Sequence, residues 1–103
     1  WYYLIDNLCD HIQNYIDRNM HLSMPQVVAQ QVKEKFGTLR FYYQGGDRFI
    51  EGIVAHTEYL SGKTCEFCGS TKNIGKTQGW IITCCEECHQ KEEGLRKRSW
   101  NRL

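Results

Sequence analysis

The sequence has no long apolar run, no excess of charge of one sign and only one proline. No apolar stretch approaches the roughly 20 residues that cross a membrane, and no signal-peptide pattern is visible, so we expect no membrane partner. A formal net charge of +1 favours neither nucleic acid nor a membrane surface as partner of the whole chain. The hydrophobic content of 41% and the charged content of 24% are those of a folded domain, which argues against disorder.

The usual motifs of catalysis are also missing. The histidines are scattered at positions 11, 21, 56 and 89, and none stands in a recognisable pairing with a nucleophile. An H-x-E motif followed by P-C-x-x-C would indicate a zinc deaminase, and the sequence has none. It has no glycine-rich phosphate loop either, because Gly45-Gly46 is typical of a turn. We therefore expect a protein that is not an enzyme.

Residues 1–20 predict an amphipathic helix. The apolar residues at helical spacing are Leu4, Ile5, Leu8, Ile12, Tyr15 and Ile16. Cys9 stands beside this stripe and is expected to be a small buried hydrophobe. Because Trp1 is not methionine and already lies in the helical pattern, we expect further residues upstream. Pro25 interrupts helix formation after this segment.

Alternating apolar and polar residues over 27–43 predict a β-hairpin that turns near Phe36–Thr38. A helix across Pro25–Lys35 is the competing prediction, since glutamine, lysine and glutamate tolerate either structure. After the hairpin, Asp47 is expected to cap a second helix that ends at Ser61–Gly62.

The cysteines are clustered, with five of the six between positions 65 and 88. A secreted disulfide framework spreads its cysteines along the chain, whereas two C-x-x-C pairs indicate a metal site in a reducing compartment. The predicted ligands of one structural zinc ion are Cys65, Cys68, Cys85 and Cys88. The 16 residues between the pairs lie within the range of structural zinc sites, and four thiolates leave no open catalytic position. Disulfide pairing is the alternative in an oxidising compartment.

The ligands beyond the first pair have competitors. Cys84 forms an i, i+4 pair with Cys88, and His89 could replace one thiolate. We favour Cys85 because Cys85 and Cys88 repeat the geometry of the first pair, while Cys84 points the opposite way at a strand end.

The surroundings of the cysteines predict a treble-clef-like unit over residues 63–93. The segment C-E-F-C-G at 65–69 has the form of a zinc knuckle, and Trp80–Thr83 reads as a short strand that leads to the second pair. A helix is expected to begin at that pair. We expect Trp80 and Phe67 to pack this unit against residues 1–62.

Two basic segments are candidates for nucleic-acid binding. In the basic tail, residues 94–103, the candidate contacts are Arg96, Lys97, Arg98, Trp100 and Arg102, because cations meet phosphates and an indole stacks on a base. A solvated, partly frayed terminus explains the same composition, and we favour it.

The second basic segment is the hairpin, where Lys33, Lys35 and Arg40 alternate with aromatic residues. This pattern suits stacking on nucleic-acid bases. It equally fits a strand with Tyr43 on a core face and Tyr42 outside, and we favour that interpretation.

The order of these motifs resembles a group of small, largely uncharacterised zinc-binding proteins encoded by phages and prophages. The resemblance covers most of the chain through Cys88 and is carried by KEKFGTLRFYYQGGD, CEFCG, a Gly-Trp and T-x-C-x-x-C. The doubled Cys84-Cys85 departs from the pattern of that group. The resemblance implies a bacterial cytoplasmic setting and a zinc-bound module, but no established activity.

The sequence thus predicts an α+β fold in which two helices pack on a β-hairpin over residues 1–62, followed over 63–93 by a treble-clef-like zinc unit with four cysteine ligands. Our leading hypothesis is a non-enzymatic, phage-encoded interaction module that binds and modulates or inhibits a host protein, such as a defence protein. The alternative is a nucleic-acid-binding zinc protein that uses the basic tail and the zinc helix.

Overall fold

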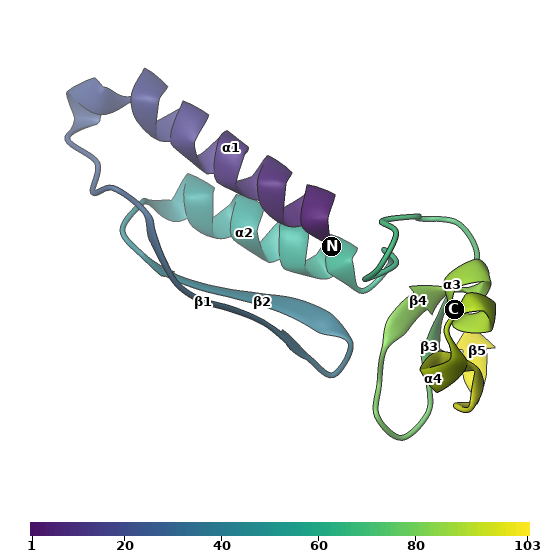
Figure 1. The fold of residues 1–103 in the computed structure, drawn as a ribbon. Helices are drawn as coiled ribbons and strands as arrows, with labels where there is room; N and C mark the ends of the chain where they lie inside the picture. Colours follow the sequence, from purple (N-terminus) through teal and green to yellow (C-terminus); the bar gives the residue numbers. More distant parts are fainter.

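The computed structural model describes residues 1–103, the whole chain, as two units arranged along an elongated molecule with principal extents of 52 × 21 × 19 Å (Figure 1). The N-terminal unit contains α1 (Tyr2–Arg18), the 3₁₀ helix η1 (Met20–Leu22), β1 (Val28–Lys35), β2 (Thr38–Gln44) and α2 (Arg48–Ser61). The C-terminal unit contains β3 (Ile74–Thr77), β4 (Thr83–Cys85), α3 (Glu86–Lys91), α4 (Glu93–Arg96) and β5 (Trp100–Arg102). The predicted α+β class is confirmed. No helix combines the length and the apolar character that crossing a membrane requires.

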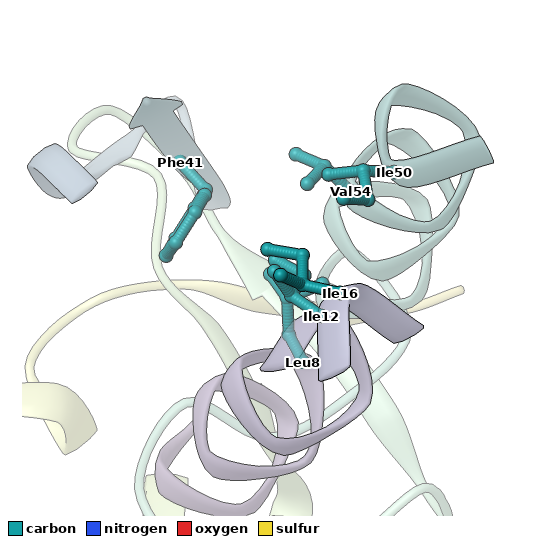
Figure 2. Packing of buried hydrophobic residues seen from close by; sticks show 6 residues of the cluster. All are labelled: Leu8, Ile12, Ile16, Phe41, Ile50 and Val54. Carbon is teal, nitrogen blue, oxygen red and sulfur yellow. The ribbon is translucent and has the colours of Figure 1, made fainter. Parts of the chain in front are cut away.

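The core of the N-terminal unit lies where α1, α2 and β2 meet (Figure 2). Its buried residues are Leu8, Ile12, Ile16, Phe41, Ile50 and Val54. The three residues of α1 share one stripe because they are four positions apart, which is about one helical turn. Tyr43 packs against this cluster while Tyr42 is exposed, as the strand pattern predicts.

The cysteine of α1 lies outside this core. Cys9 is exposed, so the prediction of a buried thiol is wrong. The reason is helical geometry: each residue is rotated by about 100° from the one before it, so the neighbour of buried Leu8 turns away from the core.

The hairpin pairs β1 with β2 in antiparallel register, with Val32 opposite Phe41 and Lys33 opposite Arg40. Its turn is formed by Phe36 and Gly37, which have φ angles of +53° and +79°, as two-residue hairpin turns of type I′ require. The predicted hairpin is confirmed, and the alternative helix over Pro25–Lys35 is wrong.

The second helix begins and ends where its capping signals indicate. The Asp47 carboxylate accepts a hydrogen bond from the N–H of Ile50 at 3.2 Å, and the last helical residue is Ser61. The Ser61 hydroxyl also accepts the backbone N–H of Leu39 at 2.8 Å, which ties the end of α2 to β2.

The C-terminal unit is built on a three-stranded sheet in the order β4-β3-β5. Strand β5 comes from the segment predicted to be a basic tail, and it pairs antiparallel with β3. The helix α4 already begins at Glu93, so residues 94–103 are a helix and an edge strand of this unit and not a free terminus.

The contact between the two units does not use the residues expected from the sequence. Phe67 and Trp80 are exposed, so the prediction that they pack the units together is wrong. The joint instead uses Trp1, whose indole N–H lies 3.1 Å from the carbonyl of Ser61 and 2.9 Å from that of Thr64. This buried indole joins the start of α1 to the end of α2 and to the entry of the C-terminal unit.

A second contact joins the hairpin turn to β4. The Thr83 hydroxyl donates to the Gly37 carbonyl at 2.6 Å. A Cβ on Gly37 would lie 2.8 Å from Cγ2 of Ile81, so glycine at this turn permits the close approach of the two hairpins.

Candidate metal centre

The first cysteine pair lies in a tight loop that precedes β3. The N–H of Cys65 donates to the carbonyl of Ser70 at 2.8 Å, and the N–H of Gly69 donates back to the carbonyl of Cys65 at 3.1 Å. Gly69 has a φ of +79°, a left-handed conformation that glycine adopts without steric cost. The closed loop turns Cys68 back toward Cys65, as in a zinc knuckle.

The second pair lies where β4 passes into α3. Cys85 is the last residue of β4 and the N-cap of α3, and its sulfur accepts the N–H of Cys88 at 3.4 Å. Cys88 lies in the first turn of the helix, where burial and the neighbouring cysteine sulfurs raise the pKa of its thiol. The predicted order of knuckle, hairpin and ligand-bearing helix matches the observed one.

The four sulfur atoms of Cys65, Cys68, Cys85 and Cys88 all lie within 4.8 Å of one another. A tetrahedral ion with metal–sulfur bonds of about 2.3 Å would place its ligands about 3.8 Å apart. The sulfurs of Cys68 and Cys85 are 3.7 Å apart, close to that value and far beyond the roughly 2.05 Å of a disulfide. All six cysteines are free. The residues therefore fit one metal ion in a closed site.

The thiols of this region differ in acidity. Burial by itself would raise the pKa of the Cys65 thiol, but backbone N–H groups of Cys68, Cys85 and Phe67 donate to its sulfur and hold the pKa at about 7. Burial raises the pKa of the Cys84 thiol to about 11. A thiolate therefore forms far more readily at Cys65 than at Cys84.

The two competing ligands lie elsewhere. Cys84 is fully buried in a cluster that also contains the ligands Cys65 and Cys85. Because successive strand residues point to opposite faces, the sulfur of Cys84 turns away from that of Cys85. The ring of His89 stacks on Trp100, and its Nε2 lies 2.9 Å from the carbonyl of Arg98. Neither residue belongs to the group of four sulfurs.

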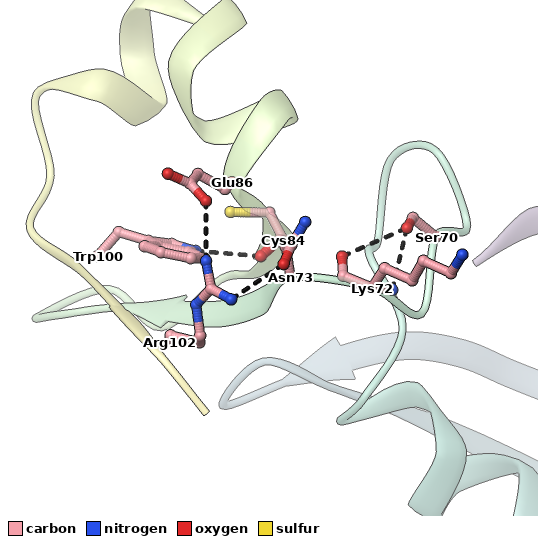
Figure 3. Close-up of polar contacts among 7 residues, drawn as sticks. All are labelled: Ser70, Lys72, Asn73, Cys84, Glu86, Trp100 and Arg102. Atoms are coloured by element: carbon pink, nitrogen blue, oxygen red, sulfur yellow. Dashed lines mark hydrogen bonds and ion pairs between the residues drawn. The ribbon is translucent and has the colours of Figure 1, made fainter.

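Two of the five predicted nucleic-acid contacts of the tail, Trp100 and Arg102, are engaged within the protein (Figure 3). The indole N–H of Trp100 donates to the carbonyl of Cys84 at 3.0 Å. The guanidinium of Arg102 lies 3.0 Å from both the Glu86 carboxylate and the Asn73 side-chain oxygen.

The other three candidates are exposed cations of the C-terminal unit. The ammonium of Lys97 lies 4.0 Å from the Glu93 carboxylate, whereas no ion pair is formed by Arg96 or Arg98. Arg96, Lys97 and Arg98 therefore remain exposed, whereas Trp100 and Arg102 contact other residues of the unit. The three residues of β5 are too few for a strand pattern to be visible in the sequence.

Close packing of β5 on β3 supports the cysteine cluster and leads to a first prediction. A Cβ on Gly75 would lie 2.4 Å from both the carbonyl oxygen of Asn101 and the ring of Trp100. The substitution Gly75→Ala must therefore displace β5, and we expect it to lower the free energy of unfolding by about 1–3 kcal/mol. Urea denaturation of the metal-loaded protein measures this change.

The matched control is Gly94→Ala in α4, where no heavy atom lies within 4 Å of the added methyl group. Alanine is the better helix former, so this variant should be at least as stable as the wild type. A Gly75→Ala protein with the denaturation midpoint of the wild type would contradict the packing of β5.

No protein-family model, curated protein or solved structure matches this chain. The geometry itself supports a four-thiolate binding site for one metal ion, buried on the side of Cys65 and Cys85 and open to solvent at Cys68. Four thiolates around one ion leave no coordination position for a substrate.

Proposed function

We propose that the metal ion is zinc, that its role is structural, and that the chain is a non-enzymatic interaction module. Zinc is supported by the ligand set, because soft thiolates in tetrahedral arrangement are typical of structural zinc sites. A structural role is supported by the position of the four cysteines, which join the loop before β3 to the start of α3.

The observation that carries the interaction proposal is an exposed aromatic pair at two adjoining hairpin turns. Phe36 and Trp80 are 69% and 65% exposed, and with Ile81 they line a cleft of about 250 Å³ between the units. Large aromatic side chains that protrude beside a cleft are typical of the residues that dominate protein interfaces.

The backbone at Phe36 supports a functional role for this ring. A bulky residue at a φ of +53° is strained, and asparagine followed by glycine would fit the same turn better. Strain of this kind persists at functional sites because the side chain is needed there. We therefore place the contact surface at Phe36 and Trp80.

The proposed partner is a protein of a bacterial host cell, and the proposed consequence is modulation or inhibition of that protein, such as a defence protein. The resemblance of the sequence to phage and prophage proteins supports this partner and a cytoplasmic setting. The aromatic cleft is where that partner would be bound.

A second prediction separates stability from binding. The substitution Phe36→Asn should relieve the strained turn and raise the free energy of unfolding by up to about 1 kcal/mol. It should also weaken partner binding by roughly 30-fold, which corresponds to the loss of an interface hot spot. The measurements are urea denaturation and affinity capture from bacterial lysate with the zinc-loaded protein.

The controls use variants of similar exposure. Trp80→Ala should lose the same captured protein, whereas Leu22→Ala, an exposed apolar residue in η1, should retain it. Equal capture by wild type, Phe36→Asn and Trp80→Ala, or no protein retained above a metal-free control, would contradict the proposal.

A further inference from the structure

We propose that the outer face of the β1–β2 hairpin binds single-stranded nucleic acid, with cations at the phosphates and an exposed tyrosine as a stacking platform. This proposal goes beyond the protein interaction described above, since it concerns the sheet face, which meets the cleft at the hairpin turns through Lys35 and Phe36. It also places the nucleic-acid contacts on the hairpin instead of on the predicted basic tail, residues 94–103.

The strand register defines this face. Leu39 and Phe41 are buried against the helices, so the residues between them point to the opposite side of the sheet. The outer face consists of the opposed pairs Gln31 and Tyr42, Lys33 and Arg40, Lys35 and Thr38, and Val28 and Gln44. Both helices of the unit lie on the inner side (Figure 1). The outer face thus carries three cations and no acid.

These cations have no acidic partner within the protein. The three ion pairs of the structure all lie in the C-terminal unit, at Glu86, Glu87 and Glu93. None of the lysine or arginine residues of the outer face has a carboxylate within 4.0 Å. Arg40 also has a buried Nε without a hydrogen-bond acceptor. The chain as a whole has a net charge of only +1, so these unpaired cations are a local concentration of positive charge. Such a face attracts a polyanion.

A further cation without an ion pair lies where the hairpin meets the C-terminal unit. The ammonium of Lys76 and the methyl group of Thr38 both lie within 4.0 Å of the Cβ position of Gly62. Lys76 donates to the Thr83 hydroxyl at 2.6 Å and forms no ion pair. Lys76 is partly buried, and burial lowers the pKa of its ammonium, so this cation belongs to the joint between the units and not to the outer face.

Aromatic rings on the hairpin select the kind of polyanion. The ammonium of Lys33 lies 5.7 Å from the ring centre of Tyr42, and that of Lys35 lies 5.8 Å from the ring centre of Phe36. Each cation thus lies next to an exposed ring. In a nucleic acid, each phosphate likewise lies near a base, so one cation and one ring could contact one nucleotide. Bases of a single strand are free to stack on such rings, whereas bases in a duplex are not. An acidic protein would match the charge but would not use the stacking surface.

The test measures fluorescence anisotropy of a labelled oligo(dT) of about 20 nucleotides with the whole, zinc-loaded protein. We expect binding at low salt that weakens as salt rises, because each phosphate contact releases a counterion. The double variant Lys33→Gln, Lys35→Gln should bind about tenfold more weakly or worse, with the slope of log K against log salt reduced by about 1.4. Tyr42→Thr should weaken binding roughly tenfold without changing that slope.

The matched control is the double variant Arg96→Gln, Arg98→Gln, which removes the same charge from the two unpaired arginines of the predicted tail. It should bind the oligonucleotide like the wild type. Metal content and circular dichroism establish that each variant is folded.

Three outcomes would overturn the proposal. The first is no binding of the oligonucleotide at low salt, and the second is a loss of binding only in the Arg96→Gln, Arg98→Gln variant. The third is that polyglutamate displaces the oligonucleotide and Tyr42→Thr binds it like the wild type, which would indicate an acidic protein as partner. Capture of a protein is tested separately with Phe36→Asn and Trp80→Ala, because these two variants keep Lys33, Lys35 and Tyr42, whereas Lys35 also lines the cleft.

Discussion

Replacing Cys65 by serine is expected to abolish stoichiometric zinc binding and to unfold the C-terminal unit. Cys65 is fully buried, and its sulfur lies among the three other cysteine sulfurs, so no other side chain of the structure is placed to substitute for it. Zinc binding contributes about 10–16 kcal/mol to the folding of small zinc domains, far more than the packing of a short sheet can replace. Metal analysis, cobalt–thiolate absorbance and circular dichroism measure the loss.

The matched control for this variant is Cys84→Ala. Cys84 is equally buried, but its sulfur is not among the four that lie together, so we expect this variant to retain one zinc ion per chain. Removing zinc from the wild-type protein with a chelator should unfold the C-terminal unit, as Cys65→Ser is expected to do. Full zinc content in the Cys65→Ser protein would refute the four-cysteine assignment.

The second large effect is expected in the core of the N-terminal unit. The side chain of Ile50 is 0% exposed and lies between α1 and β2 (Figure 2). Truncation by Ile50→Ala leaves a cavity and should cost about 2–5 kcal/mol of unfolding free energy. Urea denaturation followed by far-ultraviolet circular dichroism measures this cost.

The comparison variant is Val28→Ala on β1, where the side chain is 57% exposed. It should change the free energy of unfolding by less than about 0.5 kcal/mol. Because Ile50 and the cysteines belong to separate clusters, the folded Ile50→Ala protein should still bind one zinc ion per chain. Equal denaturation midpoints for Ile50→Ala and Val28→Ala would show that the core has been assigned wrongly.

The N-terminal unit was predictable because its signals are local. The four-residue spacing of Leu8, Ile12 and Ile16 is a property of one helix, and the cap at Asp47 acts within one turn. The hairpin could be predicted from alternation on both sides of Gly37. None of these features depends on a residue far away in the chain.

The four cysteines were predictable for a related reason. A C-x-x-C pair can converge on one ion through the geometry of its own loop, so the spacing alone indicates the chemistry. The choice between Cys84 and Cys85 depends on which face of β4 each side chain takes, and strand alternation decides it. The only part of the site that depends on long-range structure is that the two C-x-x-C pairs come close together.

The C-terminal residues show where local signals fail. Arg102 and Trp100 are a charged and an aromatic residue in a basic segment, and composition alone indicates a solvated terminus. In the structure this segment instead pairs with β3 as a strand. Gly75 leaves room for the Trp100 ring, and Glu86 forms an ion pair with Arg102. A strand of three residues has too little periodicity to reveal this pairing.

The sequence by itself determined the class of fold, the hairpin turn and the four thiols that can hold one metal ion, because each depends on neighbours within a turn or a loop. Only the tertiary structure decided which aromatic residues are exposed and which cations are unpaired. Trp80 is exposed, and it is Trp1 and Thr83 that form hydrogen bonds between the units. Lys33 and Lys35 form no ion pair because the register places no acidic residue on their face of the hairpin. These surfaces depend on contacts between segments that are distant in the chain, and they are where we expect the partners to bind.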